Sequence, residues 1–165
     1  MKRLLFAIQI IILFPCTLPG CSKDNGTSSS YFNGKIDGVP FSSTTGLWAT
    51  SGAAGDKIIA IRTQAPNYFL LYLNGGGTDI NPGVYDFVPG PNERSAVFYE
   101  NNIGYSAGQF SCYFGSCPFY GSGKITIRAI NKKHVEGSFE FVTSVNGSTG
   151  VSKTVTEGDF NVRRD

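Results

Sequence analysis

A single histidine and a scattered set of carboxylates are the side chains of this chain that could carry acid–base chemistry. Most glycoside hydrolases use two carboxylates placed on either side of the glycosidic bond. No spacing selects two carboxylates here, so a polysaccharide-acting enzyme with an unidentified carboxylate pair is kept as an alternative function. The candidates are Asp37, Asp56, Asp79, Asp86, Glu93, Glu100, Glu136, Glu140, Glu157 and Asp159.

Metal and nucleophile chemistry have little support in the sequence. His134 follows two lysines at a predicted hairpin turn, where a solvated side chain is the ordinary outcome. Asp79 and Asn81 in the loop of residues 75–83 offer oxygen ligands, but the spacing is not that of an EF-hand. We therefore expect no catalytic residue, no metal site and no cofactor.

The N-terminal segment has the pattern of an export signal. Met1-Lys2-Arg3 is a short positive start, and residues 4–14 (LLFAIQIIILF) are apolar apart from Gln9. A membrane-spanning helix needs about 20 apolar residues, so this run is too short to span a bilayer. It has the length of the apolar region of a secretory signal peptide.

The sequence Leu18-Pro19-Gly20-Cys21 follows this apolar run. It resembles the lipobox of bacterial lipoproteins, with a branched apolar residue three positions before the cysteine and a small residue directly before it. In that family the cysteine sulfur receives a diacylglyceryl group, the signal is cut before the cysteine, and the new amino group is acylated, for example with palmitate. The resemblance implies a signal peptide over residues 1–20 and a membrane anchor on Cys21, because two or more acyl chains hold a protein stably.

Residues 21–30 comprise the predicted lipidated cysteine and a run of small polar residues, which we predict to be a flexible tether. The tether leads to a single predicted domain at residues 31–165. The SKD sequence at residues 22–24 resembles the short charged signal of some surface lipoproteins of Bacteroidota. We expect an outer-membrane location, on the cell surface or on the periplasmic face. Loss of Lys2 and Arg3 leaves 12 basic and 12 acidic residues, so no basic surface for nucleic acid is predicted.

Four cysteines are present, and two of them are left for the folded domain. Cys16 is removed with the signal and Cys21 is the predicted lipid anchor. Cys112 and Cys117 have the spacing C-x4-C, and an exported protein lives where disulfides persist. We expect a local disulfide between them, because a zinc site would need two more ligands and His134 is the single histidine.

The domain has the composition of an all-β protein, with short alternating apolar runs that end at Gly, Pro and Asn. We predict an antiparallel β-sandwich of about ten strands, with a small lipocalin-like β-barrel as the alternative. Residues 57–64 and 68–74 are apolar on both faces, which favours central strands. The predicted strands are residues 31–36, 39–41, 47–51, 57–64, 68–74, 84–87, 95–100, 124–130, 134–143 and 151–162.

One hairpin can be placed in register from its alternation alone. A three-residue loop at residues 131–133 sets the apolar positions of the two flanking strands opposite each other. The same register pairs Arg128 with Glu136 and Lys124 with Glu140, which predicts one solvent-facing face for this sheet. The residues predicted to point inward are Ile125, Ile127, Ala129, Val135, Gly137, Phe139 and Phe141.

Three segments of the domain carry a wider resemblance. They are YFNGKIDGVPFSS at residues 31–43, the hairpin sequence at residues 123–142, and VTEGDFNV at residues 155–162. They resemble the opening, hairpin and closing strands of small lipid-anchored lipoproteins of Bacteroidota. The shared features are turn glycines and inward aromatic residues, and the family has no assigned function. The resemblance therefore implies a fold and a location but no activity.

Residues 104–123 are rich in glycine and aromatic residues and contain the predicted disulfide. Rigid aromatic side chains on a stapled loop make a low-entropy binding surface, and aromatic rings suit the faces of sugars. The alternative is that the rings continue the core as two further strands. We expect a non-enzymatic binding or structural module for a glycan or an envelope protein, with a small-hydrophobe-binding barrel as a further alternative. The candidate binding residues are Tyr105, Phe110, Tyr113, Phe114, Phe119 and Tyr120.

Overall fold

A computed structural model describes residues 29–51, 58–64, 68–89, 92–109 and 119–164 of the chain. Over these residues there is no helix, and so none long and apolar enough to cross a membrane. The strands are β1 (Tyr31–Ile36), β2 (Val39–Ser43), β3 (Trp48–Ser51), β4 (Ile58–Arg62), β5 (Tyr68–Asn74), β6 (Gly83–Asp86), β7 (Arg94–Glu100), β8 (Ile103–Gln109), β9 (Phe119–Tyr120), β10 (Ser122–Ile130), β11 (His134–Val142) and β12 (Thr154–Arg163).

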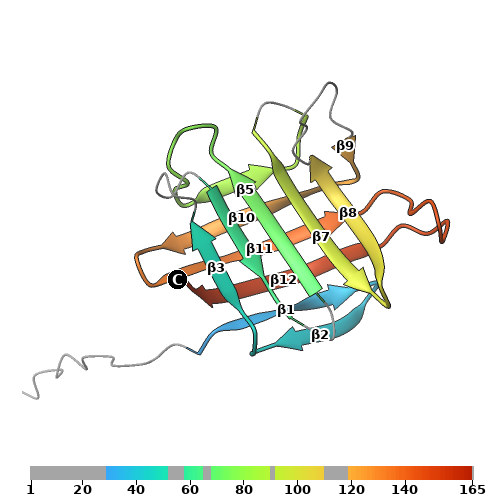
Figure 1. Ribbon diagram of the computed structural model, residues 1–165, viewed down its shortest axis with the longest axis horizontal. Coiled ribbons are helices and arrows are strands. Elements are labelled where there is room, and N and C mark those ends of the chain that lie inside the picture. The colour runs from blue at the N-terminus through green and yellow to red at the C-terminus, as the bar shows by residue number, and fades with distance from the viewer. Residues whose placement is uncertain (1–28, 52–57, 65–67, 90–91, 110–118, 165) are drawn as a thin grey trace, which may run out of the picture.

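These strands form two 6-stranded antiparallel sheets that pack face to face (Figure 1). Sheet A has the order β2-β1-β12-β11-β10-β6, and sheet B has the order β3-β4-β5-β7-β8-β9. The strands of the two sheets cross one another in Figure 1. Over the described residues each sheet ends in an edge strand on both sides, so the predicted β-sandwich is confirmed and the closed barrel is not found.

Phenylalanine rings from both sheets fill the space between them. Phe32, Phe139 and Phe160 come from sheet A, and Phe69 and Phe98 come from sheet B. Phe32 stacks on Phe139 with ring centroids 4.7 Å apart and reaches Phe69 of the other sheet at 5.3 Å. These contacts join the two sheets, because each ring removes a large apolar area from water.

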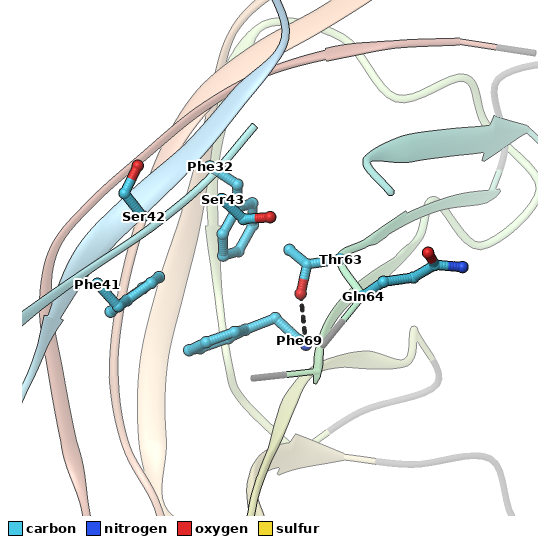
Figure 2. A pocket seen from close by; sticks show the side chains of 7 residues that line it. All are labelled: Phe32, Phe41, Ser42, Ser43, Thr63, Gln64 and Phe69. Carbon is cyan, nitrogen blue, oxygen red and sulfur yellow. Dashed lines mark hydrogen bonds between the residues drawn. The ribbon is translucent and has the colours of Figure 1, made fainter. Parts of the chain in front are cut away.

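A small cavity of about 20 Å³ lies between the two sheets (Figure 2). A volume of this size holds about one water molecule, so it has no room for the small hydrophobic ligand of a carrier protein. The backbone N–H of Phe69 donates to Thr63 Oγ1 at 2.9 Å beside the cavity. The residues that line it are Phe32, Phe41, Ser42, Ser43, Thr63, Gln64 and Phe69.

The β10–β11 hairpin has the predicted register over most of its length. Lys124 lies opposite Glu140 in the ladder, and their side chains form an ion pair at 3.0 Å. Arg128 forms the second predicted ion pair with Glu136 at 3.1 Å. Both pairs lie on the outer face of sheet A, which confirms that this face meets solvent.

The prediction that Ala129 points inward is wrong. The register of β10 shifts between Ile127 and Ala129, so Arg128 is an extra residue opposite β11. Such a bulge reverses the alternation beyond it. Ala129 is consequently exposed, and Ile130 packs against the core in its place.

Candidate functional site

The predicted aromatic binding segment is divided between the core and the surface. Tyr105 lies in β8, is 4% exposed, and stacks on Phe98 with ring centroids 5.0 Å apart, so its ring is part of the core. Tyr120 in β9 is half-buried. The segment thus supplies β8 and β9, the two further strands of the alternative interpretation. Phe119 is the other residue of β9, while Phe110, Cys112, Tyr113, Phe114 and Cys117 lie outside the described residues.

The predicted signal peptide, Cys21 and most of the predicted tether also lie outside the described residues. Ser30, at the predicted end of the tether, accepts a hydrogen bond on Oγ from the backbone N–H of Arg163 at 3.2 Å. The first strand begins at Tyr31, where the domain was predicted to start.

A hollow of about 300 Å³ lies along the edge of β8. The connection between β11 and β12 runs beside this edge, because Ser144 N donates to Ser106 O at 3.0 Å and Asn146 Nδ2 donates to Gly104 O at 2.7 Å. The hollow therefore presents hydroxyl, amide and backbone groups. Its lining residues are Gly104, Tyr105, Ser106, Tyr120, Ser144, Val145, Asn146 and Gly147.

Residues 104–108 read Gly-Tyr-Ser-Ala-Gly, which has the spacing of the nucleophile elbow of α/β-hydrolases. That elbow is a sharp turn from a strand into a helix. Here the five residues lie inside the continuous strand β8, and His134 is in the other sheet, at the start of β11. The motif therefore does not form the strand-to-helix turn of that elbow.

The outer face of sheet B carries a group of half-buried aromatic side chains. Phe69, Leu71 and Leu73 of β5 point into the core, so the residues that alternate with them point outward. Ala49 of β3 and Ile61 of β4 are also buried, so their neighbours Trp48 and Arg62 point outward. We call the resulting surface the aromatic face, and its outward side chains are Trp48, Arg62, Tyr68, Leu70, Tyr72, Val97 and Tyr99.

The ladder of sheet B sets these side chains in rows across the strands. One row runs through Trp48, Arg62, Leu70, Val97 and Ser106, each residue directly opposite the next. Neighbouring strands lie about 4.8 Å apart, so this row extends for about 19 Å. The row ends at Ser106, which also lines the hollow beside β8. The ladder therefore leads from the aromatic face to the hollow through Val97, which is 9% exposed.

A second row contains the most exposed ring of this surface. Tyr68 lies opposite Tyr99, and their rings meet edge to face with centroids 5.7 Å apart. Tyr99 is 44% exposed and lies over Gly104, where an added Cβ would be 3.1 Å from its ring. The missing side chain at Gly104 lets the Tyr99 ring lie close to the sheet. In Figure 1 this face of sheet B is turned toward the viewer.

The polar groups around the aromatic face are unevenly distributed. Burial, together with the negative charge of Glu93, raises the pKa of the Tyr72 hydroxyl. Arg62 is half-buried in the first row, and within the described part of the chain its Nε has no hydrogen-bond partner. This surface thus offers flat rings, hydroxyl groups and a guanidinium, which together can stack on a sugar and donate to its oxygens.

Most of the candidate carboxylates form ion pairs away from the aromatic face. The pKa of Lys153 is raised by its hydrogen bonds to Asp37 and Glu100, and the pKa of Asp37 is lowered, chiefly by the backbone N–H of Thr154. These contacts tie β12 to turns of both sheets. The ion pairs join Asp37 and Glu100 to Lys153, Glu136 and Asp159 to Arg128, Glu140 to Lys124, and Glu157 to Lys35.

The remaining titratable candidates are scattered. His134 is half-buried beside a hollow that Glu136 and Asn161 also line, and Asp79 lies in the exposed loop before β6. Among the described residues, no three of His, Cys, Asp and Glu come together in a way that could hold a metal ion. Asp86 ends β6, Glu93 precedes β7, and Asp56 lies outside the described residues.

Comparisons of the chain with protein-family models, with curated proteins and with solved structures found no match. The candidate site therefore rests on the geometry of this chain alone. The aromatic face was not predicted as a site, although the alternation of Tyr68, Leu70 and Tyr72 with buried residues is visible in the sequence.

Proposed function

We propose that this protein is a lipid-anchored binding protein of the bacterial outer membrane whose folded domain binds a glycan without modifying it. The observation that carries the proposal is the aromatic face of sheet B. In the described residues no further layer of strands lies over this face (Figure 1), although its side chains include Trp48, Tyr68, Tyr72 and Tyr99.

A glycan fits this surface better than a protein segment does. Aromatic rings present a negative π face that attracts the C–H bonds on the face of a pyranose ring. The rings of Trp48 and Tyr99 lie three strands apart in one sheet, so they can meet separate sugars of one chain. At the end of the row, Ser106 lines the hollow and offers a hydroxyl group to a sugar.

The anchor in this proposal comes from the lipobox resemblance at Cys21 and from the polar tether after it. We expect the wild-type protein, expressed in a bacterium, to incorporate labelled palmitate and to sediment with the membranes. Cys21→Ser removes the sulfur that receives the diacylglyceryl group, so both properties should be lost. Cys16→Ser is the matched control and should keep the label. Labelling of the Cys21→Ser protein would refute the anchor.

Replacing Trp48 by Ala is expected to weaken glycan binding about fivefold, because the variant loses a stacking platform worth about 1 kcal/mol. Tyr99→Ala removes the most exposed ring of the face and should act in the same direction. Binding is measured with the detergent-solubilised full-length protein on a panel of defined oligosaccharides, and then by calorimetry on those that bind.

Tyr31→Ala is the control for these variants, because Tyr31 lies on the outer face of sheet A. Its hydroxyl donates to Asp159 there, far from the aromatic face in the strand order. Equal loss of binding in all three variants would show a general effect on the fold. Slow hydrolysis of a bound oligosaccharide by the pure protein would favour the enzymatic alternative instead.

A further inference from the structure

Arg62 occupies a central position on the aromatic face. It is the last residue of β4, directly opposite Trp48 on one side and Leu70 on the other. Its neighbours in sequence, Ile61 and Thr63, are buried, so the Arg62 side chain points away from the core. Side chains directly opposite each other in an antiparallel pair have Cβ atoms about 5 Å apart. The guanidinium therefore lies within reach of a group stacked on the Trp48 indole.

The charge of Arg62 is not neutralised within the described part of the chain. Its Nε is inaccessible to solvent and has no hydrogen-bond acceptor there, and no ion pair of Arg62 is found. Four other cations of the domain differ in this respect. Lys35, Lys124, Arg128 and Lys153 each contact at least one carboxylate.

Carboxylates are also rare near this guanidinium. Among the described residues, the outward positions of β3, β4, β5 and β7 carry none. Glu93 precedes β7 and acts on Tyr72, whereas Arg62 lies opposite Leu70, toward the other end of β5. An arginine with an apolar and aromatic surround and no acidic neighbour favours an anionic ligand, because each of its N–H donors needs an acceptor.

We propose that the aromatic face binds an acidic glycan, with the Arg62 guanidinium donating to the carboxylate of a uronic-acid sugar whose ring stacks on Trp48. The planar fork of a guanidinium matches the two oxygens of a carboxylate, which lysine does not. This inference rests on the proposed glycan-binding function and names the class of glycan.

The test compares two probes with the same sugar backbone, an oligogalacturonate with charged carboxylates and its fully methyl-esterified, uncharged form. Calorimetry with the detergent-solubilised full-length protein should give an affinity for the acid form that is higher by about tenfold or more. This preference should shrink as salt is added. Arg62→Gln should bring the two affinities together, while Trp48→Ala should weaken both.

Arg163→Gln is the matched control, because Arg163 is an exposed arginine of sheet A and its loss should leave the preference unchanged. Thermal unfolding of each variant shows whether it is folded. If Arg62→Gln does not fold, the comparison of the two probes on the wild-type protein still shows whether the acidic glycan is preferred.

Two results would overturn the inference in distinguishable ways. Equal affinity of the wild-type protein for the acid and its ester, or binding of neutral oligosaccharides alone, removes the role of Arg62 and leaves the glycan-binding function in place. Absence of binding to every oligosaccharide on the panel removes the function and the inference together.

Discussion

Phe32→Ala is expected to lower the free energy of unfolding by about 3–5 kcal/mol, the usual loss when a large buried ring is truncated. Phe32 is 0% exposed and contacts rings of both sheets. Its centroid lies 4.7 Å from Phe139, 5.3 Å from Phe69 and 6.4 Å from Phe160. A cavity left there would sit between rigid aromatic neighbours, which can collapse only in part.

The measurement is equilibrium unfolding in a chemical denaturant, followed by circular dichroism. Val39→Ala is the control, because Val39 is 67% exposed on the edge strand β2 and its truncation should change stability by less than about 0.5 kcal/mol. Domains of this size are stable by about 5–15 kcal/mol, so the Phe32 variant should show a clearly lower midpoint. A change below about 1 kcal/mol would mean that the ring cluster is not the main link between the sheets.

Gly137→Ala should destabilise the domain by about 3 kcal/mol, at the upper end of the range for overpacking. Gly137 lies on β11, which is an interior strand of sheet A. A Cβ at this position would lie 2.1 Å from the carbonyl oxygen of Thr126 and 2.5 Å from Cζ of Phe160. The carbonyl belongs to the neighbouring strand β10, so the backbone of the sheet itself would have to move.

Gly83→Ala provides the matched control for this variant. Gly83 is exposed on β6, and its added Cβ would meet no atom closer than Asn81 O at 3.9 Å. We expect the stability of this control to stay within about 0.5 kcal/mol of the wild type in the same denaturant series. Equal stability of the Gly137 and Gly83 variants would show that β10 and β11 are not packed as closely as described.

The alternation of apolar residues was sufficient to predict the fold class and one hairpin. Lys124 and Glu140 are opposite each other as predicted, because a period of two allows one register to bury both apolar faces. The bulge at Arg128 could not be predicted. A single inserted residue leaves no mark on the composition, and it moved Ala129 to the outside.

The segment that includes Tyr105 shows a different limit of sequence analysis. Its aromatic and glycine residues were compatible with an exposed binding loop and with a pair of core strands, and its alternation favoured the strands. Local sequence contains no information on whether a second sheet lies above Tyr105. In the structure Tyr105 is 4% exposed and belongs to the core cluster between the two sheets, where it stacks on Phe98 of the neighbouring strand β7.

For this protein, most of the strands, the inward and outward positions of the β10–β11 hairpin as far as the bulge at Arg128, and the pairing of these two strands follow from the sequence. Which outward residues lie side by side across the sheet is visible only in the tertiary structure. Trp48, Arg62, Leu70 and Val97 come from separate strands, and they form one row because of the order and register of sheet B. That order depends on contacts between residues far apart in the chain, which a local period of two cannot specify.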